Sequence, residues 1–216
     1  FDKFSSANNK LSTQMKATGE VMSVGRTIEE SLLKAARSLE IGVNHLYMKK
    51  FETFSDDEML NYIKDGTDDR IYAIAELLRR KTDIGMICNA TKIDMLFLEK
   101  IKNIVKTENK LREHIGDTDT LYTAKKLGFS DEFIGKLWGM TGEEIYKIRE
   151  KRGMFPVYKM IDTCASEFES YIPYFYSTYE DENESVVSDK KKIIVLGSGP
   201  IRIGQGVEFD YSTVHA

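Results

Sequence analysis

The sequence from residue 130 to residue 153 reads SDEFIGKLWGMTGEEIYKIREKRG. It holds a Ser and a Thr that each precede acidic residues and then apolar residues at helical spacing, which is the pattern of a capped helix start. Glu144, three residues after the Thr, completes a capping box. The stretch therefore predicts two short helices, residues 130–137 and 141–152, separated by Gly139.

The same start and stop signals recur upstream, from residue 27 onward. Capping boxes and acidic helix-start residues precede apolar residues at spacings of three and four. The predicted starts, with the residue that ends each run, are Thr27 with Gly42, Ser55 with Gly66, Asp68 or Asp69 with Lys81, Thr91 with Lys106, and Thr120 with Gly128. Several short, well-capped helices joined by small turns predict a mostly α fold, a compact multi-helix domain.

The chain changes in character after residue 153. Residues 156–180 are rich in aromatic side chains and are expected to be extended, and the charged residues 181–192 are expected to form a linker. Residues 193–196 read IIVL, a run typical of a strand buried on both faces. Such a strand needs neighbouring strands and covering helices, which the few residues after Gly206 are too short to supply. The sequence therefore predicts the mostly helical middle of a larger enzyme.

A glycine-rich loop, GSGPIRIGQG, follows at residues 197–206. Glycines allow backbone amides to approach phosphate oxygens closely, because no Cβ intervenes. The dinucleotide fingerprint would require a third glycine at position 202, which is Arg202, and a P-loop would require Gly-Lys-Ser/Thr. Spacing alone favours a tight structural turn and leaves phosphate binding as the second reading.

Composition narrows the class of protein. The chain of 216 residues is 41% hydrophobic and 31% charged, which is typical of a globular protein. Its formal net charge of -4 argues against a dedicated nucleic-acid binder, and its apolar runs are too short for a membrane span. Cys88 and Cys164 lie far apart without CxxC spacing, so neither a disulfide framework nor a zinc site is expected. A reducing, cytoplasmic compartment is the simplest interpretation.

The two helices predicted at residues 130–137 and 141–152 could also form a helix-turn-helix reader of nucleic acid. The second helix would present Lys147, Arg149, Lys151 and Arg152. Three glutamates on the same helix would repel phosphates, so an ordinary helical corner with a solvated charged face is favoured.

Catalytic chemistry finds little support in the sequence. Cys164 has no histidine near it in the chain, and His45, His114 and His215 are scattered. A lone cysteine is more often a small buried residue than a nucleophile. Asp117 and Asp119 are interpreted as helix-start residues, not metal ligands. No catalytic residue and no metal ligand is therefore predicted.

Three longer stretches resemble the large chain of carbamoyl-phosphate synthase. They read LSTQMKATGEVM at residues 11–22, PVYKMIDTCA at residues 156–165 and GPIRIGQGVEFDY at residues 199–211. Their order and separation also match that family, whereas residues 43–155 match mainly by position and helical character. One departure is the stretch Tyr-Ser-Thr at residues 211–213, where the family usually has more cysteine.

The resemblance implies a domain plan and a function. Residues 1–41 would close the carboxyphosphate synthetic half, residues 42–190 would form the helical oligomerisation and connecting domain, and residues 191–216 would open the carbamoyl-phosphate synthetic half. Short α/β pieces of two ATP-grasp halves would thus flank the helices. The full enzyme, an ATP-dependent carbon–nitrogen ligase, makes carbamoyl phosphate for pyrimidine and arginine synthesis from bicarbonate, glutamine-derived ammonia and two ATP. The piece alone is expected to be inactive.

The resemblance also implies partners, cofactors and one site. Gly206 and Glu208 match positions that line the family's intramolecular tunnel, and no ATP-binding residue is expected in this segment. The full enzyme would use ATP with Mg²⁺ or Mn²⁺, with K⁺ as a further candidate. Its partners would be a glutaminase small chain and other large chains, without nucleic acid or membrane. The rival reading is a free-standing helical adaptor whose terminal strand pairs with another protein.

Overall fold

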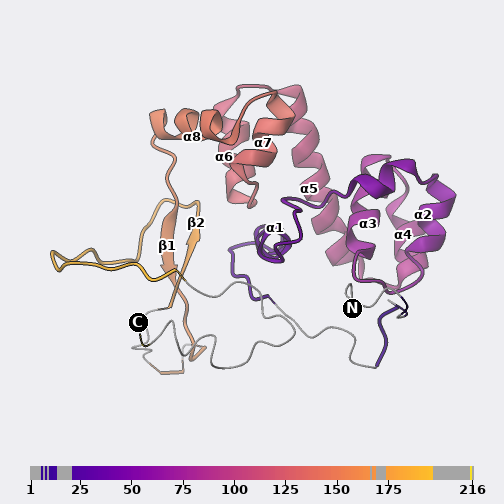
Figure 1. Ribbon diagram of the computed structural model, residues 1–216, viewed down its shortest axis with the longest axis horizontal. Helices are drawn as coiled ribbons and strands as arrows, with labels where there is room; N and C mark the ends of the chain where they lie inside the picture. Colours follow the sequence, from indigo (N-terminus) through magenta and orange to yellow (C-terminus); the bar gives the residue numbers. More distant parts are fainter. Residues whose placement is uncertain are drawn as a thin grey trace.

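The computed structural model describes residues 6, 8, 10–13, 21–165, 167–168, 174–196 and 215. Within them the mostly α fold is confirmed (Figure 1). The helices are α1 (Ile28–Ser38), the 3-10 helix η1 (Lys49–Thr53), α2 (Asp56–Tyr62), α3 (Arg70–Arg79), α4 (Ile84–Thr91), α5 (Met95–Glu113), α6 (Thr118–Lys126), α7 (Asp131–Trp138) and α8 (Gly142–Lys151). The strands β1 (Val157–Met160) and β2 (Phe175–Thr178) pair antiparallel, with Val157 opposite Thr178.

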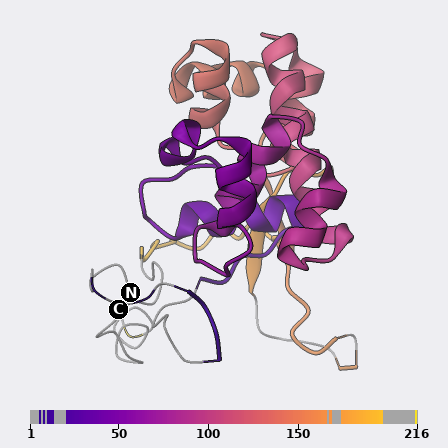
Figure 2. The ribbon, with the colours of Figure 1, turned by 90° about the vertical axis from the view of Figure 1, so that its right-hand side faces the viewer.

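The long helix α5 connects two groups of shorter helices (Figures 1 and 2). It packs against α3 and α4 on one side and against α6 and α7 on the other, and α1 also lies against it. The corner formed by α7 and α8 extends the second group, and the β1–β2 ribbon lies beyond α1. The two groups are therefore assembled on one helix, and α1 fills the space between that helix and the ribbon.

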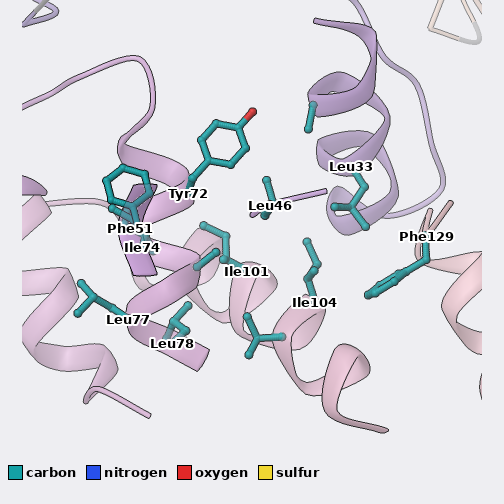
Figure 3. Close-up of a cluster of buried hydrophobic side chains, with 14 of the residues drawn as sticks. Leu33, Leu46, Phe51, Tyr72, Ile74, Leu77, Leu78, Ile101, Ile104 and Phe129 are labelled. Carbon is teal, nitrogen blue, oxygen red and sulfur yellow. The ribbon is translucent and has the colours of Figure 1, made fainter. Parts of the chain in front are cut away.

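The core is one continuous apolar cluster (Figure 3). Side chains from α1, α3 and α5 point toward one another, and the loop before η1 adds a further leucine. The labelled members are Leu33, Leu46, Phe51, Tyr72, Ile74, Leu77, Leu78, Ile101, Ile104 and Phe129. All of them are buried. Helix α3 buries most of its circumference, because it packs against η1 and α2 as well as α5.

Ser55, Ser130 and Thr141 cap helices as the sequence predicts, whereas Thr91 does not. Ser55 and Thr141 form complete capping boxes. The predicted start at Thr91 is wrong: Thr91 ends the unpredicted helix α4, and Asp94 caps α5 by accepting from the Leu96 amide at 2.8 Å. Helix α4 contains glycine and asparagine and has weak intrinsic helix propensity, so its packing on α5 decides its conformation.

The strand predicted at residues 193–196 is not formed among the described residues, which supply no neighbouring strand for it. These residues have no strand conformation, and Ile193, Ile194 and Leu196 are 91%, 85% and 92% exposed. A strand requires a hydrogen-bonded neighbour, and within the described ranges only β1 and β2 form a sheet. The apolar run alone is therefore insufficient to form a strand.

The turn between α6 and α7 touches α1 through Gly128. This glycine has a φ of +86°, and a Cβ placed on it would lie 2.9 Å from Cα and 3.0 Å from the backbone oxygen of Glu30. Both atoms belong to the backbone of α1, which cannot move aside as a flexible side chain could. The close contact of the two elements therefore depends on the missing side chain.

Gly128→Ala should lower the free energy of unfolding by roughly 2–4 kcal/mol, because it adds both backbone strain and a steric clash. Gly139→Ala is the matched control: Gly139 has a φ of +70°, and a Cβ there meets nothing within 4 Å. That control should cost only about 1–2 kcal/mol, the strain contribution alone. Urea unfolding of the two variants measures the difference, and equal losses would refute the close-contact argument.

Candidate functional site

Lys34 on α1 joins the segments by which the chain enters and leaves the helical domain. Its ammonium donates to the carbonyl oxygen of Val24 at 2.8 Å and to that of Ser177 in β2 at 2.6 Å. The same nitrogen lies 2.8 Å from Oε1 of Glu30, one turn earlier on α1. Three acceptors thus converge on one cation, so the chain before α1 and strand β2 are held side by side. We call this contact of α1 with residues 21–26 and 175–180 the junction.

Residues after β2 add to the junction. The Arg26 Nε donates to Oε1 of Glu180 at 3.0 Å, in a partly exposed pair that contributes little stability by itself. Glu184 turns back onto β1: its amide donates to the Tyr158 oxygen at 2.9 Å, and its carboxylate accepts from the Met160 amide at 2.7 Å. The leaving segment is therefore fixed both to the start of α1 and to the ribbon.

The predicted capping box at Thr27 is only half formed, and its other half serves the junction. The Thr27 hydroxyl accepts from the Glu30 amide at 3.1 Å, as expected. The carboxylate of Glu30 accepts from the Arg26 amide at 2.7 Å instead of reaching back to Thr27. Glu30 is 1% exposed, so this carboxylate links the helix start, the entering chain and Lys34 in a buried site.

Asp131, the first residue of α7, neutralises two buried cations. Lys125 on α6 lies with its ammonium 3.0 Å from Oδ1, and Arg149 on α8 donates through Nε at 2.9 Å and Nη2 at 2.5 Å. Burial lowers the pKa of Lys125 to about 8, although Asp131 offsets part of the effect. Both cations face the ring of Tyr179, at 5.0 Å and 5.5 Å from its centre. Tyr179, just after β2, is thereby anchored on α6 and α8.

Glu108, in the C-terminal half of α5, fixes the loop before η1. Its Oε1 accepts from His45 Nε2 at 2.8 Å and from Arg79 Nη2 at 2.7 Å, and its Oε2 accepts from Arg79 Nε at 2.8 Å. Arg79 also donates to the Leu46 carbonyl at 2.6 Å. Burial alone would raise the pKa of Glu108, but the hydrogen bonds from Arg79 and His45 outweigh it and lower that pKa to about 2. The carboxylate is therefore ionised and fully engaged.

His45 is neutral in this cluster. Burial lowers the pKa of His45, and its Nδ1 has no hydrogen-bond partner in the part of the chain that the structure describes. An imidazolium would leave an unpaired N–H at that buried position, whereas the neutral ring donates only through Nε2. The ring stacks on Phe133, with 3.7 Å between ring centres.

Two family models match this chain. The carbamoyl-phosphate synthetase large chain, oligomerisation domain, matches residues 20–153, which is more than half of the chain. The chain belongs to the carbamoyl-phosphate synthetase large chain family. The carbamoyl phosphate synthase preATP-grasp domain matches residues 189–216. The chain is thus a segment of an ATP-dependent ligase, and the helices of Figure 1 are its oligomerisation domain, through which copies associate.

The structure can be compared with each site residue considered from the sequence of this synthetase segment. Gly206 and Glu208 lie outside the described residues. Asp117 caps α6 by accepting from the Thr120 amide at 2.8 Å, which confirms it as a helix-start residue. Cys88 and Cys164 are free thiols. Among the described residues no group of three or more His, Cys, Asp or Glu could hold a metal ion, and no helix there is long and apolar enough to cross a membrane.

The helices 130–137 and 141–152 form the corner that the sequence favoured. Arg149, expected on an exposed basic face, is 5% exposed and bound to Asp131. Lys147 pairs with Glu143 at 2.8 Å on the outer face. The synthetase segment therefore uses one cation of this helix inside the structure, and the exposed face carries mixed charges.

An apolar groove of about 700 Å³ lies between α1, α3 and α5. Ile28, Leu32, Ile71 and Ile101 line it, together with Phe97, which is 50% exposed. Phe97 lies in the first turn of α5, and half of its side chain faces solvent.

The structural roles of Lys34, Lys125 and Arg149 were not predicted from the sequence; Lys125 and Arg149 are buried, and Lys34 is mostly buried. A signal was present for Arg149, which lies four residues after the buried Ile145 and so on the inner face of α8. Lys125 similarly lies four residues after the buried Leu121. A cation at an apolar-face position indicates a buried ion pair, but the position of its carboxylate partner depends on the tertiary fold.

Glu108→Gln should lower the free energy of unfolding at pH 7 by roughly 3 kcal/mol, because it leaves Arg79 with Glu76 as its only carboxylate partner among the described residues and leaves its hydrogen bonds to position 108 without a charge. It should also weaken the fall in the free energy of unfolding as pH decreases. The wild-type carboxyl has a folded pKa of about 2 against an ordinary 4.5, so its contribution is present above pH 4.5 and is lost as pH falls toward 2.

Urea unfolding between pH 7 and pH 3 measures both effects. Glu113→Gln, an exposed change at the end of α5, is the control and should leave both quantities nearly unchanged. A Glu108→Gln protein with wild-type pH dependence would contradict the assigned ionisation.

Proposed function

We propose that this chain is the connecting and oligomerisation segment of the large chain of a glutamine-dependent carbamoyl-phosphate synthase. The full enzyme would make carbamoyl phosphate from bicarbonate, glutamine-derived ammonia and two ATP, for pyrimidine and arginine synthesis in the cytoplasm. A glutaminase small chain and other large chains are its proposed partners. The segment itself would position the two synthetic halves and carry no catalytic group.

The junction is the observation that supports the connecting role. Residues 21–26 lead into α1, and residues 175–180 lead out toward the stretch that matches the preATP-grasp domain. Lys34 and Arg26 tie these two segments together, although more than 140 residues separate Val24 from Ser177 in the sequence. Because the helical domain begins and ends at the same place, it would fix the relative position of the two synthetic halves that flank it.

The proposed domain limits follow the resemblance of the sequence. Residues 1–41 are assigned to the end of the carboxyphosphate half, residues 42–190 to the connecting domain and residues 191–216 to the start of the carbamoyl-phosphate half. The oligomerisation-domain match begins earlier, at residue 20, and so includes α1. Because α1 contacts both the entering and the leaving chain, it acts as a structural bridge under either boundary.

The chemistry of the intermediates gives the tunnel proposal its rationale. Carboxyphosphate and carbamate decompose in water, so transfer between two sites requires a path that excludes solvent. We assign Gly206 and Glu208 to the lining of that path, on the resemblance of residues 199–211. A glycine at position 206 would leave the path open, whereas a side chain would narrow it. ATP with Mg²⁺ or Mn²⁺, and K⁺ as a further candidate, would bind in the flanking halves.

Lys34→Met should loosen the junction, because it removes the ammonium while keeping most of the length of the side chain. The expected result is faster amide hydrogen exchange in Phe175–Thr178, because Ser177 loses its tie to α1, with unchanged exchange in α3. In the complete enzyme the same change should lower carbamoyl-phosphate output per ATP hydrolysed, if the junction positions the halves.

The control for Lys34→Met is Lys106→Met, which removes an exposed ammonium from α5. Sedimentation velocity verifies that neither change alters self-association. Wild-type exchange in β2 of the Lys34→Met variant would refute the junction, and loosened exchange with a wild-type output ratio would refute its connecting role.

Gly206→Leu in the complete enzyme tests the tunnel. Narrowing the path should leave glutamine hydrolysis running while carbamoyl-phosphate formation falls, because the intermediate is lost between the sites. The ratio of glutamate to carbamoyl phosphate produced is the measurement, and Gly206→Ala, a smaller change, should shift it less. An unchanged ratio in the Leu variant would overturn the assignment of Gly206.

A further inference from the structure

A small cavity of about 300 Å³ opens at the junction. Helix α1, the turn from α6 to α7, the start of α7 and the end of β2 enclose it. Its lining includes Glu30, Lys34, Arg37, Lys125, Asp131 and Tyr179. A single water takes up only about 30 Å³ of liquid volume, so the space admits a small ion with several waters.

Positive charge exceeds negative charge around this cavity. Four cations, Lys34, Arg37, Lys125 and Arg149, stand against the two carboxylates of Glu30 and Asp131. Both carboxylates are already engaged. Glu30 binds Lys34 and the Arg26 amide, and Asp131 binds Lys125 and Arg149. The imbalance therefore falls on the remaining cation, Arg37.

Arg37 is a half-buried guanidinium with most of its donors unused. Its Nη1 donates to the Gly128 carbonyl at 2.7 Å, and in the described part of the chain it forms no ion pair. Burial lowers the pKa of Arg37, and the nearby charge of Glu30 offsets this only in part. A guanidinium carries five N–H donors in a planar fork suited to two oxygens of one anion.

The start of α7 adds a further attraction for negative charge. Ser130 and Asp131 line the cavity, and Ser130 caps α7 by accepting from the Phe133 amide at 3.1 Å. The positive end of the helix dipole thus faces the same space, although Asp131 already occupies part of its field.

We propose that the junction cavity binds a small oxyanion, such as phosphate or bicarbonate, between Arg37 and Lys125. The anion's oxygens accept from the free donors of Arg37, and its charge offsets the positive excess. Because α1 and Tyr179 both border the cavity, a bound oxyanion tightens the junction. A carboxylate from elsewhere in the polypeptide has the same chemistry, and the test separates that source from a free anion.

Inorganic phosphate is the probe. The 216-residue chain is titrated with phosphate at pH 7, with NaCl holding ionic strength constant, by calorimetry and by thermal unfolding. We expect saturable binding and a Tm that rises beyond the chloride baseline. Arg37→Gln should weaken phosphate binding roughly tenfold or more, the loss of a charge-assisted pair of hydrogen bonds. Arg112→Gln, which removes an exposed cation near the end of α5, should bind as the wild type does.

A second variant keeps the test decisive if Arg37→Gln unfolds. Arg37→Lys retains the charge but not the planar fork, so it should bind phosphate with an affinity between those of the wild type and Arg37→Gln. Absence of saturable binding to the wild type would overturn the proposal and point to a carboxylate of the polypeptide in the cavity. Equal weakening in Arg37→Gln and Arg112→Gln would also overturn it, since binding would then follow net charge alone.

Discussion

The Lys34 ammonium sets the constraint on which the organisation of this domain depends. A cation on the inner face of α1 requires acceptors, and it finds them on the entering chain, on β2 and on its own helix. All three acceptors are needed to position the two chain segments. The ammonium makes all of its hydrogen bonds only when both the entering chain and β2 lie against α1. The chain thus enters and leaves the helical domain at one place, beside α1. The two groups of helices that pack on α5 extend from there.

Buried charges add to an apolar core that does not by itself determine how the short helices are oriented. Apolar contacts between α1, α3 and α5 could be satisfied by several orientations of short helices, because burial depends on area and not on angle. Hydrogen-bonded charges are directional. Glu108 fixes the loop before η1 against α3 and α5, and Asp131 fixes α6, α7 and α8 against one another. We attribute to these two carboxylates the fixed orientation of the two helix groups, at the cost of desolvating each ion.

The sequence was sufficient for most helix starts and for the fold class, because capping and helical spacing are local signals. Ser55, Ser130 and Thr141 cap helices as predicted. It was not sufficient for α4, whose weak propensity is overridden by packing on α5. It was also insufficient for the strand at residues 193–196, whose formation depends on partners that lie elsewhere. The junction could not be predicted, because nothing local relates Lys34 to Ser177.

The charge imbalance of the cavity and the close contact at Gly128 have one structural origin. The missing side chain of Gly128 lets the α6–α7 turn reach the backbone of Glu30, and the carbonyl of the same glycine accepts from Arg37. That contact brings Lys125 and Arg37, from helices distant in sequence, to the border of one small space. Apolar residues could have filled this space without any demand for a counter-ion. The use of cations there makes the strength of the junction sensitive to the anions around it, whereas the apolar core on the other side of α1 is not.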